Sequence, residues 1–360
     1  MTIRLLLGTF AVSAVVGGVA TALARRVALA AGLVAAVRPD RLHDRERPYG
    51  GGLAIAATLV VVVGGGWAAV QVFQPGWVGE AVRNGAADHA PLLVRLAIGA
   101  LLFFMIGVVD DRYGLPAVAK LVLQLVSAAV VVVGLGIGAT VWLAPAWAAE
   151  VLSIAWIVVV VNAYNMLDHA DGLAGSVGLV ALVFFAVGQT LVGEWFVPLV
   201  AMATAGALAG FLVHNAPPAR LFMGDAGTMT VGYLLAALTM AARYYFPEFG
   251  TTRLVVLVPV VVLAVPLADA VCVVASRLWQ GRNPMRGDAT SHLGHRLLAR
   301  GAGPQRAAAW AALVTAVTGV ASLLLYASSL QLHLVGWFLA GSVVVMMLLA
   351  RRRGREARRA

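Results

Sequence analysis

Long apolar runs are the feature that most constrains what this chain can fold into. About eleven runs of mostly apolar residues follow one another, and a helix needs about 20 such residues to cross a bilayer. Only 12% of the residues are charged, against about 25% in a soluble domain. The sequence therefore predicts an all-α, polytopic helical bundle with ten or eleven transmembrane helices, near residues 5–24, 51–72, 92–109, 117–138, 150–167, 173–192, 196–213, 227–246, 253–276, 307–327 and 331–350.

The basic residues predict how the bundle is inserted. With the N-terminus outside, 21 of the 26 lysines and arginines fall on connections at one side of the membrane. Positively charged loops stay in the cytoplasm, so that side is predicted to be cytoplasmic. The net charge of +10 is then explained by loops on an anionic leaflet, and no nucleic-acid partner is expected. We expect one transmembrane domain, 1–350, and a basic cytoplasmic tail, 351–360.

The first apolar run is expected to be a membrane helix and not a cleaved signal. Its basic pair, Arg25 and Arg26, follows the run, whereas a secretory signal carries its positive charge in front. The single cysteine, Cys272, excludes a disulfide framework and a cysteine-rich metal site.

Polar segments interrupt the apolar background at five places, all on the predicted cytoplasmic side. An ionisable side chain costs several kcal/mol in hydrocarbon, so it is kept where it faces water, a partner or a ligand. Five such segments on one side predict a single site at that face, formed by residues 38–56, 110–124, 162–175, 214–232 and 269–301.

Acidic and amide side chains in these segments suit a hard cation. Asn162, Asn165 and Asp168 recur every three residues and line one side of a last helical turn, which Gly172 is expected to end. Asp225 lies between two glycines, at a predicted junction of loop and helix. Carboxylate and amide oxygens favour Mg²⁺ or Mn²⁺ over zinc. Interhelical hydrogen bonding is the alternative for one asparagine.

Basic and aromatic side chains supply the complementary part. Lys120, one turn before Gln124, is favoured as a phosphate partner over a lipid-facing lysine. His292 and His295 with the neighbouring arginines predict a phosphate clamp, since no third ligand at helical spacing completes a zinc site. Phe222 could stack on a base or anchor the interface. The combination predicts phosphoryl transfer between a soluble phosphate compound and a lipid phosphate.

Taken together, the five segments resemble the polyprenyl-phosphate N-acetylhexosamine-1-phosphate transferases, of the glycosyltransferase family 4 type, over about residues 38–301. DDRYGLPAVAKLVLQ matches the family's DD–LP–K–Q signature, and LFMGDAGT is close to FMGD-x-G-S. NAYNMLDHADGLAG matches N-x-x-N-x-x-D-G-x-D-G-L, except that His169 stands where glycine is usual. HLGHRLL is similar to H-x-H-H-R-L-L of the undecaprenyl-phosphate N-acetylglucosamine branch, with Gly294 in place of the middle histidine and one residue inserted after Asp288.

The resemblance implies roles for residues of each segment. It implies Mg²⁺ (or Mn²⁺) held by Asp225 with Asn165, and a UDP-N-acetylhexosamine and undecaprenyl phosphate as partners. The implied catalytic residues are Asp110, Asp111, Lys120 and Asp168. The implied substrate-binding residues are Asp171, Asn215, Phe222, His292, His295, Arg296 and His43.

The implied reaction transfers N-acetylglucosamine 1-phosphate to the lipid phosphate, releases UMP and begins a cell-envelope polysaccharide. The resemblance also implies that 1–350 is a single catalytic domain in a bacterial inner (plasma) membrane. Three alternatives stay open: a muramoyl-pentapeptide donor, another amino sugar and, in a different class, an ion-coupled transporter. Transporters hold their charges near the membrane midplane in paired repeats, and no repeat is evident here. Homodimerisation is compatible with the sequence.

Overall fold

A computed structural model describes residues 2–31, 34–35, 47–73, 76, 78, 80–139, 145–244, 253–283, 292–298, 301, 303–326 and 341–342. In this part of the chain the only strands are the two short ones, β1 (Val34–Ala35) and β2 (Arg47–Pro48), which pair antiparallel. The rest of the regular structure is helical, as predicted: α1 (Thr2–Ala30), α2 (Gly51–Leu59), η1 (Val60–Gly64), α3 (Gly65–Phe73), α4 (Glu80–Tyr113), α5 (Ala117–Ala129), η2 (Val130–Gly134), α6 (Ala146–Leu167), α7 (Leu173–Leu191), α8 (Phe196–Asn215), α9 (Gly224–Ala241), η4 (Arg253–Leu257), α10 (Val258–Val262), α11 (Ala264–Trp279), α12 (Leu293–Leu298) and α13 (Pro304–Leu324).

Eight of the described helical stretches are long and apolar enough to cross a membrane, or nine if a bent pair counts as one span. They match nine of the predicted spans. The predicted span 227–246 corresponds to α9, which falls short on composition because glycines, threonines and Asp225 occupy its first turns. The last predicted span, 331–350, lies outside the described residues apart from 341–342. The chain is a multi-pass membrane protein.

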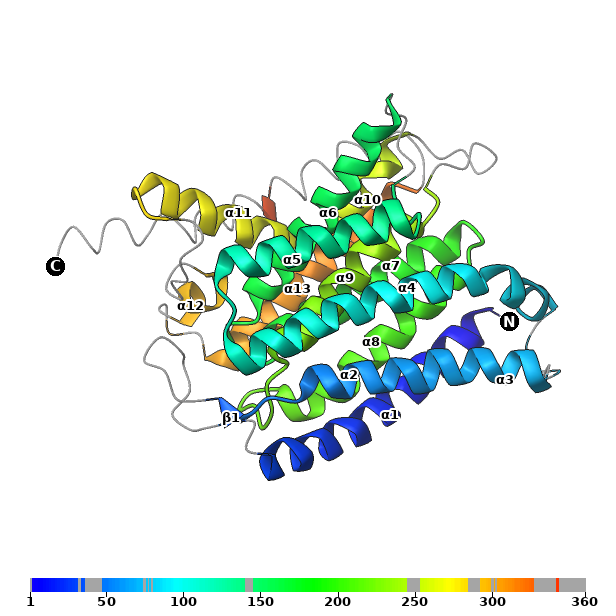
Figure 1. Cartoon of the computed structure of the whole chain (residues 1–360), viewed down its shortest axis with the longest axis horizontal. Helices are drawn as coiled ribbons and strands as arrows, with labels where there is room; N and C mark the ends of the chain where they lie inside the picture. Colours follow the sequence, from blue (N-terminus) through cyan, green and yellow to red (C-terminus); the bar gives the residue numbers. More distant parts are fainter. Residues whose placement is uncertain are drawn as a thin grey trace.

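The span predicted over 253–276 is broken in the structure. Two helical stretches, Val255–Val262 and Ala264–Trp279, meet there at a bend of 65°. Pro266 accounts for the break, because a proline has no N–H to donate and its ring clashes with the carbonyl four residues earlier, here that of Val262. The bend turns α11 away from the bundle, and in Figure 1 this helix projects at the upper left.

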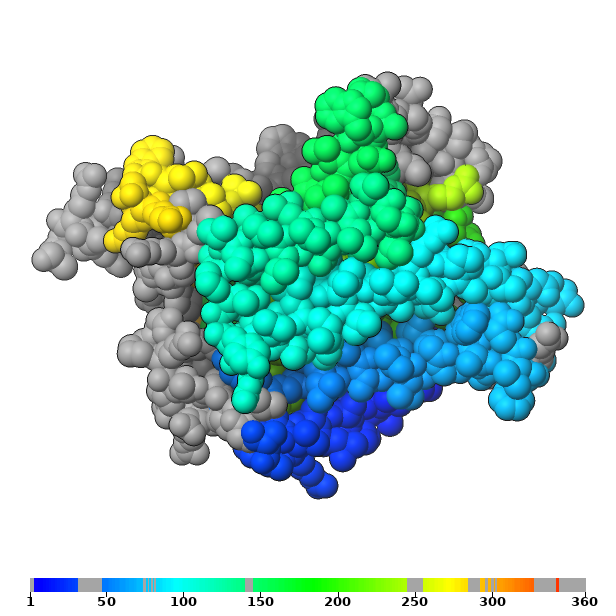
Figure 2. Space-filling view, viewed as in Figure 1, coloured from blue at the N-terminus to red at the C-terminus, as the bar shows by residue number. Residues whose placement is uncertain are grey.

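Two helices form the centre of the bundle. In the most apolar 18 residues of α8, 78% are buried, against 17% in the corresponding stretch of α2–α3. The helix α9 is buried along nearly its whole length. The helices α3, α4 and α5 lie side by side on one outer face (Figure 2). Apolar side chains of these helices and of η1 are exposed, among them Val60, Phe73, Leu101, Met105 and Val126. In a bilayer they contact lipid, so their exposure carries no cost.

Glycines let two outer helices approach the start of α9 closely. A Cβ atom at Gly52 of α2 would lie 2.3 Å from the amide nitrogen of Gly227, and one at Gly107 of α4 would lie 2.4 Å from the Cα atom of Ala226. Small residues at helix interfaces allow backbones to approach in this way. The packing holds the first turn of α9, with Asp225, between α2 and α4.

The helix ends that carry the polar segments lie at one end of the bundle. In Figure 1 this end is at the left, with β1 and α12, while the N-terminus and α3 are at the right. We call the left end, which holds Asp110, Lys120, Asn165 and Asp225, the polar end.

Candidate active site at the polar end

Lys120 is the centre of the polar end. From the first turns of α5 its ammonium donates to Asp110 Oδ2 at the end of α4 over 2.7 Å, and it also contacts Asp225 Oδ2 at the start of α9. Asn165 Oδ1, in the last turn of α6, lies 3.4 Å from the same nitrogen. Four helices thus bring one ammonium and three oxygen-bearing side chains together, as the sequence predicted.

Asn165 and Asp225 are also joined directly. Asn165 Nδ2 donates to Asp225 Oδ1 over 2.9 Å and to Thr228 Oγ1 over 2.7 Å. The Asp225 side chain is 30% exposed, against 10% for Asp110 and 16% for Lys120. An incoming molecule therefore reaches Asp225 more easily than Asp110 or Lys120.

Asp111 makes a different kind of contact. Its two carboxylate oxygens accept the backbone N–H groups of Asp225 and Ala226, over 2.8 and 3.0 Å, and so cap the N-terminus of α9. The neighbouring Gly224 has φ 72°, and a Cβ atom there would lie 2.6 Å from Asp111 Oδ2. A glycine is required at this position, and Asp111 holds the backbone from which the Asp225 side chain projects. The catalytic role predicted for Asp111 stays a prediction.

The donor set fits a divalent cation. Asp110, Asn165 and Asp225 offer oxygen atoms, which Mg²⁺ and Mn²⁺ prefer. The Lys120 ammonium stands in for such a cation, because this positive group contacts an oxygen of each of the three side chains. Two carboxylates, those of Asp110 and Asp225, contact the one ammonium, so these three side chains carry a formal charge of −1 and would attract a further cation.

The neighbouring polar residues extend the group. Asn162, one turn before Asn165, donates to Gln124 Oε1 over 2.6 Å, and among the described residues Gln124 Nε2 has no hydrogen-bond partner. Asp168 follows α6 as its C-cap residue and is half-buried. The expectation that Gly172 ends this helix is wrong: α6 ends at Leu167, and Gly172 is instead the N-cap of α7.

A second cluster lies around Asp171. Both carboxylate oxygens of Asp171 accept from Arg47 Nη1, at 3.1 and 2.9 Å, and one also accepts the N–H of Ala219. Asn215 accepts the N–H of Gly172 and donates to the carbonyl of Leu221, so it ties the α6–α7 turn to the loop before α9. The structure thus brings the predicted substrate residues Asp171 and Asn215 into one network.

Phe222 completes the second cluster with two residues of the first polar segment. Its ring lies 5.6 Å below the Arg47 guanidinium carbon and 6.2 Å from the ring of Tyr49. Two backbone hydrogen bonds hold β2 beside Phe222. The N–H of Phe222 donates to the carbonyl of Pro48, and the N–H of Gly51 donates to the carbonyl of Phe222. A planar base could lie against this aromatic and cationic surface.

The fifth polar segment is described only in part. His292 is buried, with Nδ1 3.2 Å from Asp269 Oδ2 of α11, and its ring stacks on that of His169. The predicted substrate residues His295 and Arg296 belong to α12, but their side chains lie outside the described part of the structure, as does the whole of His43.

Sequence reasoning missed four residues that the structure brings to these clusters: Arg47, Tyr49, His169 and Asp269. A signal existed for two of them. Asp269 is a carboxylate inside an apolar run, and His169 departs from the family pattern. Arg47 was counted only as an anchor to the lipid surface, because its partner Asp171 is 124 residues away.

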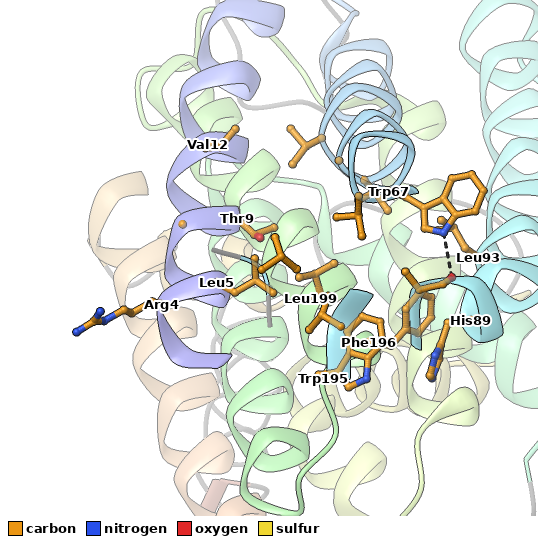
Figure 3. Close-up of a pocket in the computed structure, with 18 of the residues that line it drawn as sticks. Arg4, Leu5, Thr9, Val12, Trp67, His89, Leu93, Trp195, Phe196 and Leu199 are labelled. Carbon is orange, nitrogen blue, oxygen red and sulfur yellow. Dashed lines mark hydrogen bonds between the residues drawn. The ribbon is translucent and has the colours of Figure 1, made fainter. Parts of the chain in front are cut away.

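A cavity of about 740 Å³ lies away from these clusters, among α1, α3 and the first turns of α4 and α8 (Figure 3). Its lining is mostly apolar, with Trp67, His89 and Trp195 at one side. We call this the apolar end, and none of the predicted site residues lines its cavity.

The fold and the site define a helical membrane protein that gathers carboxylates, amides and one lysine at one end of its bundle. Residues 93–243 match the family model described as "Glycosyl transferase family 4". Over 311 residues the chain is 32% identical to the decaprenyl-phosphate N-acetylglucosaminephosphotransferase of Mycobacterium tuberculosis, covering 79% of this chain and 74% of that protein. The chain belongs to glycosyl transferase family 4.

Two further relatives differ in how much of the chain they match. The probable undecaprenyl-phosphate N-acetylglucosaminyl 1-phosphate transferase of Bacillus subtilis is 26% identical over 349 residues, 95% of this chain and 90% of that protein. The phospho-N-acetylmuramoyl-pentapeptide-transferase of a Synechococcus strain is 32% identical over only 190 residues, 47% of this chain and 53% of that protein. The likeness to the N-acetylglucosamine enzymes therefore extends over more of the chain.

Proposed function

We propose that the protein transfers N-acetylglucosamine 1-phosphate from UDP-N-acetylglucosamine to a polyprenyl phosphate such as undecaprenyl phosphate, with release of UMP. The observation that carries the proposal is the convergence of Asp110, Asn165 and Asp225 on Lys120 at one end of a membrane bundle. The relatives named above, which cover most of the chain, support the same reaction. We further propose that the polar end faces the cytoplasm of a bacterial inner membrane, in agreement with the arginine distribution.

The reaction joins two anions, so charge neutralisation is its main requirement. An oxygen of the lipid phosphate forms a bond to the phosphorus that carries the sugar, and the bond from that phosphorus to UMP breaks. The lipid phosphate is mostly dianionic at neutral pH, so it needs no strong general base. Lys120, held between helices, is placed to neutralise the phosphates that meet there.

We propose Asp225, Asn165 and Asp110 as the residues that would hold Mg²⁺. The bound ion would supply charge neutralisation to the phosphate oxygens. Lys120 contacts the same oxygens, so its ammonium must turn aside toward a phosphate when the ion binds. Asp111 positions Asp225 through the backbone of α9.

For the donor, we propose that the uridine lies against Phe222 and Tyr49. Arg47 and Asp171 hold that surface in place through their ion pair, whose side chains are 18% and 8% exposed. The polyprenyl tail remains in the bilayer beside the bundle.

The test is UMP release by the purified protein with undecaprenyl phosphate and a panel of donors: UDP-N-acetylglucosamine, UDP-N-acetylgalactosamine and UDP-N-acetylmuramoyl-pentapeptide. We expect turnover to be highest with UDP-N-acetylglucosamine. A preference for the pentapeptide donor would move the protein to the muramoyl branch. No UMP from any donor, together with ion flux in proteoliposomes, would replace the enzyme by the transporter alternative.

A further inference from the structure

His169 and Gly294, 125 residues apart in the sequence, lie in direct contact. His169 is in the turn between α6 and α7, and its Nε2 accepts the N–H of Gly294 in the first turn of α12 over 2.9 Å. Its Nδ1 lies 3.0 Å from the carbonyl of Met166. Since Nε2 accepts, the hydrogen-bond pattern assigns the proton of a neutral ring to Nδ1, which donates to Met166.

The imidazole of His169 occupies the space that a side chain at position 294 would need. A Cβ atom on Gly294 would lie 2.5 Å from His169 Nε2 and 2.9 Å from Cδ2, closer than packed atoms approach. Position 169 has a histidine where the family pattern has glycine, and position 294 has a glycine where that pattern has a histidine. The two departures are therefore one structural change, because the space between these backbones holds a single ring.

The ring also fixes the start of α12. It stacks on His292, with ring centroids 4.7 Å apart and planes inclined by 29°. His292 Nδ1 lies 3.2 Å from Asp269 Oδ2, and Asp269 Oδ1 accepts the N–H of Leu293 over 2.8 Å. Asp269 is 1% exposed and belongs to α11. The first residues of α12 are thus attached to the α6–α7 turn through His169 and to α11 through Asp269.

We infer that His169 is a positioning residue that supplies, from the α6–α7 turn, the imidazole that residue 294 cannot carry. It holds the backbone of α12 beside the α6–α7 turn, and α12 is the helix that we propose to meet the diphosphate of the sugar-nucleotide donor. The part of this inference that concerns the donor rests on the proposed function. The direct packing of the His169 ring against position 294, which we call the interlock, does not depend on it.

A metal site is the competing explanation for the same side chains. Ligand atoms of His169, Asp269 and His292 lie within 4.8 Å of one another, as in a site for a transition metal. However, the lone pair of His169 Nε2 already accepts from Gly294, and the other ring nitrogen donates to Met166. A metal ion would have to break one of these bonds, so the two explanations make opposite predictions.

The test compares His169→Gly, Gly294→His and the exchange of both residues. His169→Gly should raise the KM for the UDP-sugar about tenfold, while kcat and the KM for the lipid phosphate change less than about threefold. Gly294→His should be worse, because two rings compete for one space. The double exchange returns a single ring and should restore the donor KM to within about threefold of the wild type. Independent, multiplying losses in the double variant would overturn the inference.

A smaller substitution keeps the test decisive if Gly294→His does not fold. Gly294→Ala should lower the unfolding temperature in the natural background but not when residue 169 is glycine, because the methyl group then has room. This measurement needs no substrate, so it tests the interlock even if no UDP-sugar is turned over and the proposed function fails. Equal effects of Gly294→Ala in both backgrounds would refute the interlock. Stoichiometric zinc in the purified protein that is lost in His169→Gly would refute it in favour of the metal site.

Discussion

The cavity of the apolar end and the clusters of the polar end hold their polar side chains in different ways. At the apolar end, His89 Nδ1 lies 2.8 Å from the carbonyl of Gly85, four residues away, and Trp67 donates to the carbonyl of Ala86, 19 residues away. At the polar end, Lys120 reaches Asp225 across 105 residues, and Arg47 reaches Asp171 across 124. The two bonds at the cavity lie within one helix or between neighbouring helices, whereas the two bonds at the polar end join side chains from distant segments.

The difference teaches where the chemistry lies. The cavity of about 740 Å³ is at the apolar end, yet it is lined mostly by side chains that suit lipid, and its aromatic rings pack on one another, as His89 does on Phe196 at 4.8 Å. The polar end places charges where burial is costly, and it retains them through bonds that only the assembled bundle makes possible. Substitutions at the two ends should therefore differ sharply in effect.

The largest effect is expected at Asp225. Asp225→Asn keeps the size of the side chain but removes the charge of the proposed cation ligand, so UMP release should fall by at least about 10³-fold. The measurement is the rate with saturating donor and acceptor. Asp88→Asn, the same change on an exposed residue of α4 toward the apolar end, is the matched control and should leave the rate within about twofold. Near-normal transfer by Asp225→Asn would contradict the assignment.

Lys120→Met should lower kcat by about 10²-fold and, at the same time, lower the Mg²⁺ concentration that gives half-maximal rate. The physical reason is that the ammonium contacts the proposed ligand oxygens, and without it the carboxylates of Asp110 and Asp225 would face the ion with no competing positive charge. A magnesium titration after treatment with a chelator measures both quantities. Lys120→Arg keeps the charge and should not increase the apparent affinity for Mg²⁺. A weaker apparent affinity in Lys120→Met would mean that the lysine does not compete with the ion.

Asp111→Asn should have a smaller effect, divided between activity and stability. An asparagine offers only one oxygen to the two N–H groups that begin α9, so we expect a loss of about 1 kcal/mol in the free energy of unfolding and about a tenfold loss in rate. Thermal unfolding in detergent, read beside the UMP assay, separates the two. A loss of more than about 10³-fold without any loss of stability would show that Asp111 takes part in the chemistry.

The smallest effect is expected when the cavity of the apolar end is filled. Gly66 lines it, and a Cβ atom there would meet no atom within 4 Å. Gly66→Leu should therefore be accommodated, with less than about a twofold change in the rate of UMP release. Gly64→Leu, whose Cβ atom is equally unobstructed but which does not line the cavity, is the control. A large loss specific to Gly66→Leu would show that the apolar end takes part in turnover, and would break the contrast between the ends.

Much of the molecule follows from the sequence alone. The bilayer dictates the length and composition of each span, so the helices α4 to α8 were predictable from local runs of residues. The cost of burying charge predicts that polar residues gather at one end, and the structure brings Asp110, Lys120, Asn165 and Asp225 into contact as expected. These inferences hold because each depends on interactions between a short segment and its solvent.

Tertiary structure decided the rest, because contacts between distant segments depend on how whole helices pack. No local pattern shows that Asp111 caps α9 or that Arg47 pairs with Asp171. From the sequence, Gly294 is only a residue that differs from the family pattern. The structure gives the reason, because the ring of His169 fills the space beside it. The sequence determined which residues gather at one end of the bundle. Only the packed bundle determined which atoms touch, since a shift of one helical turn would exchange every one of these partners.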